Sequence, residues 1–205
     1  MTAGIAAETF DEAAIVGLPE PARRWLGHAI APGTPLWSSV ELTMHGQIKL
    51  GRWRSFTARQ ALAPPDGYLW TATARVAGLP VTGYDWLGSG AGEIALIPTA
   101  FRQASWSLGE HADTAVATWQ FGDDTEAAEL RVKPNGRLAQ VRISRWGNPG
   151  SAPFGRYPFG VRVETEARFG GIAIPSAFRA GWWWGTDRQH EGEFFRAEIT
   201  GADFS

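Results

Sequence analysis

The segment from Arg145 to Phe195 constrains the fold more than any other part of the chain. Its motifs RWGNPG, PFG, FGGIAIPSAF, GWWWGTD and EGEFF place glycine, proline and aromatic residues between short runs of β-forming residues. Glycine and proline interrupt regular strand pairing, and large aromatic side chains need burial on at least one side. This combination predicts a sheet whose strands bend around a large apolar interior.

Apolar and polar residues alternate along much of the remaining chain. The longest alternation runs from Val40 to Leu50, and a period of two is typical of a strand with one buried face. Alternation and turn residues predict further strands at 53–62, 68–76, 81–87, 112–121, 126–133, 137–146, 161–169, 174–184 and 193–200. Because most of these strands are separated by hairpin-sized spacings, we expect antiparallel neighbours.

A helical region is predicted near the N-terminus. Pro19 or Pro21 can open a helix, because proline is favoured in the first helical turn. Trp25 and Leu26 then fall on one side of this helix, and we expect that side to pack on the sheet.

These elements predict a mainly β fold in a single domain covering residues 1–205. The expected architecture is a strongly curved antiparallel sheet, or incomplete β-barrel, of about 9–11 strands that wraps the helix. The helical segment is expected at about 11–31 and the sheet at about 36–205. Between strands, Gly88 to Gly92 is typical of a connection, and Pro98 to Phe101 predicts a helical turn.

Composition excludes several classes of protein. The 205 residues include 19 Lys and Arg against 21 Asp and Glu, and a net charge of -2 argues against nucleic-acid binding. Cysteine is absent, so disulfides and thiolate chemistry are excluded. The N-terminal sequence MTAGIAAETFDEAAI lacks the features of a signal peptide, and no apolar run approaches the ~18 residues of a membrane span. We therefore expect a cytoplasmic protein without stable membrane insertion.

Catalytic and metal-binding motifs are missing from the sequence. The 4 histidines form no HExxH motif, and neither a GxSxG elbow nor a phosphate-binding loop occurs. Glu164 and Glu166 lie between Arg162 and Arg168, a pattern typical of a solvated ladder of charges across strands. The sequence predicts no metal site and no cofactor, and it identifies no catalytic residue.

The tryptophan residues are the main candidates for ligand contact. There are 11 of them, and Trp182, Trp183 and Trp184 are consecutive. In a continuous strand, Trp182 and Trp184 would share one face and Trp183 the other. Two interpretations stay open: both faces pack against protein, or one face lines a cavity for an apolar ligand.

Polar residues within the aromatic segment complete the candidate site. Side chains such as those of Asp187, Arg188 and Glu193 either connect a bent loop through hydrogen bonds or bind a polar group of a ligand. The candidate ligand-binding residues are Trp70, Trp146, Tyr157, Trp182, Trp184, Arg145 and Asn148.

The motifs LPEPARRWL, GQIKLGRWRSFTARQALAPPDGYLW, RWGNP, PFG, FGGIAIPS, GWWWGTD and GEFFRAEIT together resemble a bacterial family known as a domain of unknown function. The resemblance covers nearly the whole chain and implies an architecture similar to the LolA/LolB lipoprotein carriers, an incomplete barrel around helices with an apolar interior. It implies no catalytic residues. Family members have about one more hairpin after Tyr84, where this chain has Gly88 to Gly92. We expect this difference to open one edge of the barrel or widen its mouth.

Three functions are compatible with these observations. The first is binding of an apolar or amphipathic small molecule, such as a lipid, inside the curved sheet. The second is a cofactor-independent enzyme, of the cyclase or isomerase type, that uses an aromatic-lined pocket. The third is a protein-interaction module that uses an exposed sheet edge near Gly88 to Gly92.

Overall fold

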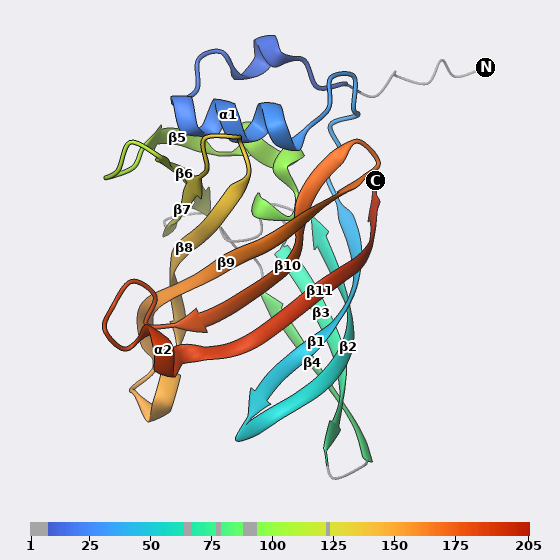
Figure 1. Cartoon of the computed structure of the whole chain (residues 1–205), viewed down its shortest axis with the longest axis vertical. Coiled ribbons are helices and arrows are strands. Elements are labelled where there is room, and N and C mark those ends of the chain that lie inside the picture. The colour runs from blue at the N-terminus through green and yellow to red at the C-terminus, as the bar shows by residue number, and fades with distance from the viewer. Residues whose placement is uncertain (1–7, 64–66, 77–78, 88–93, 122–123) are drawn as a thin grey trace, which may run out of the picture.

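In a computed structural model, the chain forms an antiparallel sheet of 11 strands that curls around helical segments on its concave side (Figure 1). The structure describes residues 8–63, 67–76, 79–87, 94–121 and 124–205. The two edge strands of this sheet are not paired with each other, so the sheet is open. The expected mainly β fold, with a curved antiparallel sheet, is confirmed.

The element bounds follow chain order. The helical segments are η1 (Glu12–Ile15), α1 (Glu20–Ala29), η3 (Pro98–Gln103), η4 (Pro149–Ser151) and α2 (Gln189–Gly192). The strands are β1 (Val40–Leu50), β2 (Arg52–Ala63), β3 (Gly67–Val76), β4 (Leu79–Leu87), β5 (Ser105–Leu108), β6 (Thr114–Phe121), β7 (Asp124–Val132), β8 (Leu138–Gly147), β9 (Gly155–Phe169), β10 (Ile172–Trp182) and β11 (Glu193–Phe204).

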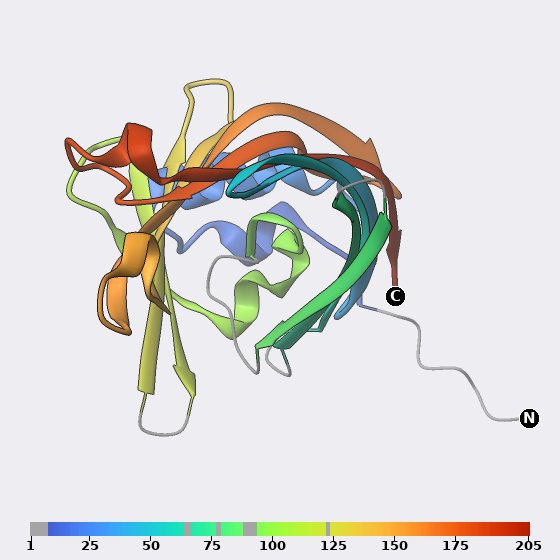
Figure 2. The same ribbon diagram turned by 90° about the horizontal axis from the view of Figure 1, so that it is seen from below.

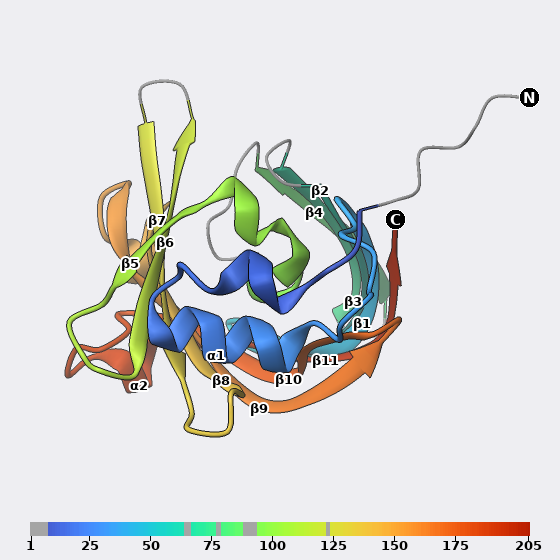
Figure 3. The same ribbon diagram turned by 90° about the horizontal axis from the view of Figure 1, so that it is seen from above.

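The strand order β4-β3-β2-β1-β11-β10-β9-β8-β7-β6-β5 consists of two meanders. Strands β1 to β4 lead outward to one edge, and β5 to β11 return from the other edge until β11 pairs with β1. The chain must therefore cross from edge to edge between β4 and β5. The described end of this crossing segment contains η3 and lies within the curve of the sheet (Figures 2 and 3). Its buried apolar residues include Ile94, Ile97 and Phe101.

Helix α1 covers one end of the concave side, together with η1 (Figure 3). Pro19 is its N-cap and Pro21 lies in its first turn, as predicted. Trp25 and Leu26 are buried on its inner side, and the Trp25 ring lies 6.2 Å from the ring of Trp106 on β5. The predicted apolar side of the helix is therefore the one that packs.

Glu166 on β9 fixes α1 to the sheet. Its carboxylate accepts hydrogen bonds from His28 Nε2 at 2.9 Å, Arg137 Nε at 3.1 Å and the backbone N–H of Leu138 at 2.8 Å. The Glu166 side chain is only 6% exposed. A buried carboxylate is stable in this position because three donors replace the water that it loses.

The expectation that Glu164 and Glu166 form one solvated ladder is wrong for Glu166. Glu164 is 39% exposed and pairs with Arg179. The β9–β10 register pairs Val163 with Phe178 and Thr165 with Ala177, so Glu164 has no residue opposite it. Such a bulge interrupts the alternation of side chains between the two faces of the sheet. Because of this interruption, Glu166 does not share the solvent-exposed face of Glu164, and its carboxylate can reach α1.

Three parts of the sheet with four or more residues were not predicted, one of them being residues 201–204 at the end of β11. Strand β5 has only four residues, and the first part of β9, residues 155–160, precedes the predicted start at 161. This part contains Pro158 and Gly160, which normally disfavour strand interiors. Pairing with β8, including Ser144 with Pro158, overrides that local preference. The predicted connection at Gly88 to Gly92 lies outside the described residues, whereas the helical turn at Pro98 is confirmed as η3.

We predict that Glu166→Ala lowers the free energy of unfolding by about 2 kcal/mol or more, because the buried N–H of Leu138 and the side-chain donors of His28 and Arg137 lose their acceptor. Glu164→Ala removes an exposed ion pair on the same strand, and it should cost less than about 1 kcal/mol. Urea denaturation followed by circular dichroism measures both values. Equal losses in the two variants would show that Glu166 does not fix the helix.

Candidate functional site

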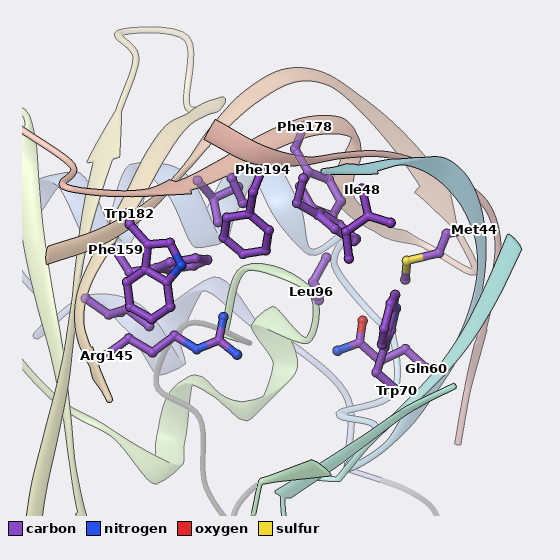
Figure 4. A pocket seen from close by; sticks show the side chains of 14 residues that line it. Met44, Ile48, Gln60, Trp70, Leu96, Arg145, Phe159, Phe178, Trp182 and Phe194 are labelled. Carbon is purple, nitrogen blue, oxygen red and sulfur yellow. The ribbon is translucent and has the colours of Figure 1, made fainter. Parts of the chain in front are cut away.

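A cavity of about 380 Å³ lies on the concave side of the sheet, between β1 to β3 on one side and β8 to β11 on the other (Figure 4). Leu96 of the crossing segment borders it, and the strands supply the rest of its wall (Figure 4). Its lining is predominantly apolar and is formed by Met44, Ile48, Gln60, Trp70, Leu96, Ile143, Arg145, Phe159, Val161, Phe178, Ala180, Trp182, Phe194 and Phe195.

Strand alternation places most of these side chains, but a bulge adds one. The β10–β11 register pairs Ala180 with Phe195 and Gly181 with Glu193, so Phe194 has no residue opposite it. A bulge lets consecutive residues turn toward the same side of a sheet. Phe194 and Phe195 consequently both line the cavity, with their ring centroids 6.4 Å apart.

Arg145 and Gln60 bring polar groups into this aromatic wall. Figure 4 shows both side chains pointing into the cavity from opposite sides, Arg145 from β8 and Gln60 from β2. The Arg145 guanidinium carbon lies 4.8 Å from the ring centroid of Phe159 and 5.7 Å from that of Trp182. Aromatic faces attract a cation at such distances, so these two rings hold the guanidinium against the cavity wall.

The consecutive tryptophan residues do not alternate as expected. Strand β10 ends at Trp182, and Trp183 has a φ of 60°, a left-handed conformation that takes the chain out of the strand. Trp182 lines the cavity, whereas Trp184 packs on Gly160. Gly160 alternates along β9 with the cavity residue Phe159, so Trp184 lies on the outer face. The expectation that Trp182 and Trp184 share a face is therefore wrong.

Two glycines make room for these indole rings. A Cβ atom at Gly147 would overlap the outer ring of Trp182, and one at Gly160 would overlap the ring of Trp184. Each ring therefore lies directly on a strand backbone, one on the inner face and the other on the outer face. Glycine is required at both positions because any other side chain would displace the ring.

The predicted residues Trp146, Tyr157 and Asn148 lie at the β8–β9 connection and are not among the residues that line the cavity. Trp146 is 53% exposed and stacks on Phe154, with the ring centroids 5.5 Å apart. The Tyr157 hydroxyl donates to the carbonyl of Pro153 at 2.7 Å. Of the seven predicted ligand-binding residues, the structure thus brings three together at the cavity, and the role of the other four in binding stays a prediction.

Several cavity residues were not singled out in the sequence, among them Phe159, Phe178, Phe194 and Gln60. Gln60 had a visible signal, because it is a polar residue between the apolar Ala58 and Leu62 on one face of β2. Phe194 had none, since its orientation depends on a bulge set by β10.

Among the described residues, no group of three or more histidine and acidic side chains is arranged to hold a metal ion. None of the helices in the described part of the chain is both long and apolar enough to span a membrane.

Two solved structures resemble this architecture. One is a putative outer membrane lipoprotein-sorting protein domain from Vibrio parahaemolyticus, with a TM-score of 0.42, 7% identity and coverage of 82% of this chain and 86% of that one. The other is a LolA superfamily protein from Nitrosomonas europaea, with a TM-score of 0.40, 8% identity and coverage of 82% and 85%. This likeness concerns architecture and carries no information on ligands. No curated protein matches the chain significantly.

Two family models match consecutive parts of the sequence. Residues 8–97 match a family of unknown function, DUF6544, and residues 91–204 match a second family of unknown function, DUF6920. The two matches overlap in the crossing segment between the edge strands. Because the second match covers more than half of the residues, the chain belongs to the DUF6920 family.

Proposed function

We propose that the protein binds an amphipathic small molecule in the cavity of the curved sheet. Its apolar part would lie against the aromatic wall, and its polar or anionic group would contact Arg145 and Gln60. The observation that carries this proposal is an open cavity whose apolar lining contains one guanidinium and one amide. Pockets for small molecules typically combine a hydrophobic wall with a few convergent polar groups in this way.

The size and chemistry of the cavity both support binding. A volume of about 380 Å³ falls within the range of ~300–1,000 Å³ that is usual for small-molecule sites. Burial of apolar surface would supply most of the affinity, at roughly 25 cal/mol per Å² before the costs of association. Arg145 would add selectivity, because a guanidinium binds a carboxylate or phosphate through charge-assisted hydrogen bonds.

Binding is better supported than catalysis at this site. In the described lining, Arg145 is the one ionisable side chain, and a guanidinium is poorly suited to exchanging protons with a substrate. The alternative of an interaction edge near Gly88 to Gly92 falls outside the described residues. The expected cytoplasmic location stays a prediction.

Oleate and oleyl alcohol test the proposal, because they share an apolar chain and differ in charge. We expect both to displace the fluorescent probe N-phenyl-1-naphthylamine from the purified protein. Arg145→Gln should weaken oleate binding about tenfold or more and alcohol binding much less, since only oleate loses a charge-assisted hydrogen bond. Ala180→Phe should weaken both ligands by filling the cavity.

Matched variants on the outer face serve as controls. Arg162→Gln removes a guanidinium from β9, and Ala177→Phe enlarges a side chain on β10, both outside the cavity lining. Neither should change either affinity. If Arg145→Gln and Ala180→Phe leave both affinities at the level of these controls, the ligand does not occupy this cavity and the proposal is wrong.

The two glycines beneath the tryptophan rings give a second prediction. Gly147→Ala should weaken oleate binding severalfold because it pushes Trp182 out of the cavity wall, whereas Gly160→Ala displaces Trp184 on the outer face and should leave affinity unchanged. Both variants should lose stability, by roughly 1–3 kcal/mol. Urea denaturation and probe displacement on the same samples separate the two effects. A loss of affinity in Gly160→Ala alone would contradict the assignment of Trp182 to the binding wall.

A further inference from the structure

Exposed apolar side chains gather at the end of the molecule opposite α1. Three segments end there, spaced apart from one another: the tip of the β1–β2 hairpin, the start of β4 and the β8–β9 connection (Figures 1 and 2). Of the eight large apolar side chains that are strongly exposed in the described residues, five belong to these segments: Leu50, Leu79, Val81, Trp146 and Phe154. Single exposed apolar residues are common on protein surfaces, but a concentration at one end indicates an interaction site.

Two of these segments carry basic residues, and none of the three carries an acidic one. Residues 49–54, 79–82 and 145–156 contain five Lys and Arg residues and no Asp or Glu. The whole chain has 19 basic against 21 acidic residues, so 14 basic and 21 acidic residues remain elsewhere. The three segments that carry the exposed apolar side chains are therefore richer in basic residues than the rest of the chain.

The basic charge is concentrated in the β1–β2 hairpin, whose sequence at 49–54 is KLGRWR. Arg145 lies in the cavity. Arg156 donates hydrogen bonds to Glu126, and this pairing raises the pKa of the Arg156 guanidinium. Lys49 and Arg52 are exposed and flank Leu50, which is 54% exposed at the tip. Lysine and arginine in such positions can extend their charges toward a polar surface while their apolar stems lie beside the leucine.

The cavity lies next to this end. Ile48 and Trp182 line the cavity. Ile48 lies two residues before Leu50 in the β1–β2 hairpin, and the Trp182 ring packs on Gly147 at the end of β8. The neighbouring β10–β11 connection contains Asp187 and an ion pair between Arg188 and Glu191. That connection adds little net charge, so the end as a whole remains basic.

We propose that this end docks on the surface of an anionic phospholipid bilayer. Leu50 and Phe154 would enter the headgroup region, and Lys49 and Arg52 would lie at the lipid phosphates. Each basic residue near an anionic membrane surface strengthens binding by about fivefold, and tryptophan, present here as Trp146, favours the interface. Docking in this orientation would bring the cavity mouth to the lipid. The inference goes beyond ligand binding and does not depend on it.

Vesicle sedimentation tests the inference with the whole protein. We expect the protein to sediment with vesicles in which about a third of the lipid is phosphatidylglycerol, and much less with vesicles of phosphatidylcholine alone. Raising the salt concentration should release it, because screening weakens the attraction between the basic hairpin and the lipid.

Two paired variants identify the surface. The double variant Lys49→Gln, Arg52→Gln should lower the partition coefficient roughly 25-fold. The double variant Leu50→Ser, Phe154→Ser should lower it at least about fivefold. The control Arg59→Gln, Lys133→Gln removes two exposed basic residues away from this end and keeps the same net charge as the first variant. It should retain most of the binding.

The result that overturns the proposal is equal binding by the wild type, the hairpin variant and the control, or no binding to anionic vesicles. The proposal would also be wrong if the protein associated with itself instead of binding vesicles, and if the double variant Leu50→Ser, Phe154→Ser abolished this self-association. Displacement of the fluorescent probe by oleate, measured on the same variants in the absence of vesicles, should be unchanged. A failure of ligand binding is therefore distinguishable from a failure of membrane docking.

Discussion

The pairing of β1 with β11 joins the two halves of the molecule in one sheet. Its register runs from Val40 opposite Phe204 to Ile48 opposite Phe195. Gly46 lies within this pairing, and a Cβ atom there would overlap the carbonyl oxygen of Arg196. The two strands therefore approach as closely as they do only because this residue is glycine. The cavity depends on this pairing, since both strands contribute side chains to its wall.

The two family matches divide the chain in a way that the topology explains. The match to residues 8–97 includes β1 to β4, and the match to residues 91–204 includes β5 to β11. Each part accounts for one meander and one side of the cavity. Gln60 comes from the first part and Arg145 from the second, so the two polar groups that face the cavity are brought together only when the halves pair.

Alternation in the sequence predicted most of the sheet, because one face of each strand is buried and the other is not. It failed where pairing partners override local preference, as for Pro158 and Gly160 in β9. Trp70, Trp182 and Arg145 were predicted as ligand contacts and do line the cavity. The orientations of Phe194, Trp184 and Glu166 depend on bulges or on a positive φ, which arise from register between strands that are distant in the chain.

The crossing segment between the edge strands has a consequence for what the cavity accepts. Its described end lies inside the curve of the sheet and places Leu96 at the cavity, opposite the walls that the strands form. If the proposed ligand binds with its polar group at Arg145, the side chain at position 96 would limit how large an apolar group fits beside it.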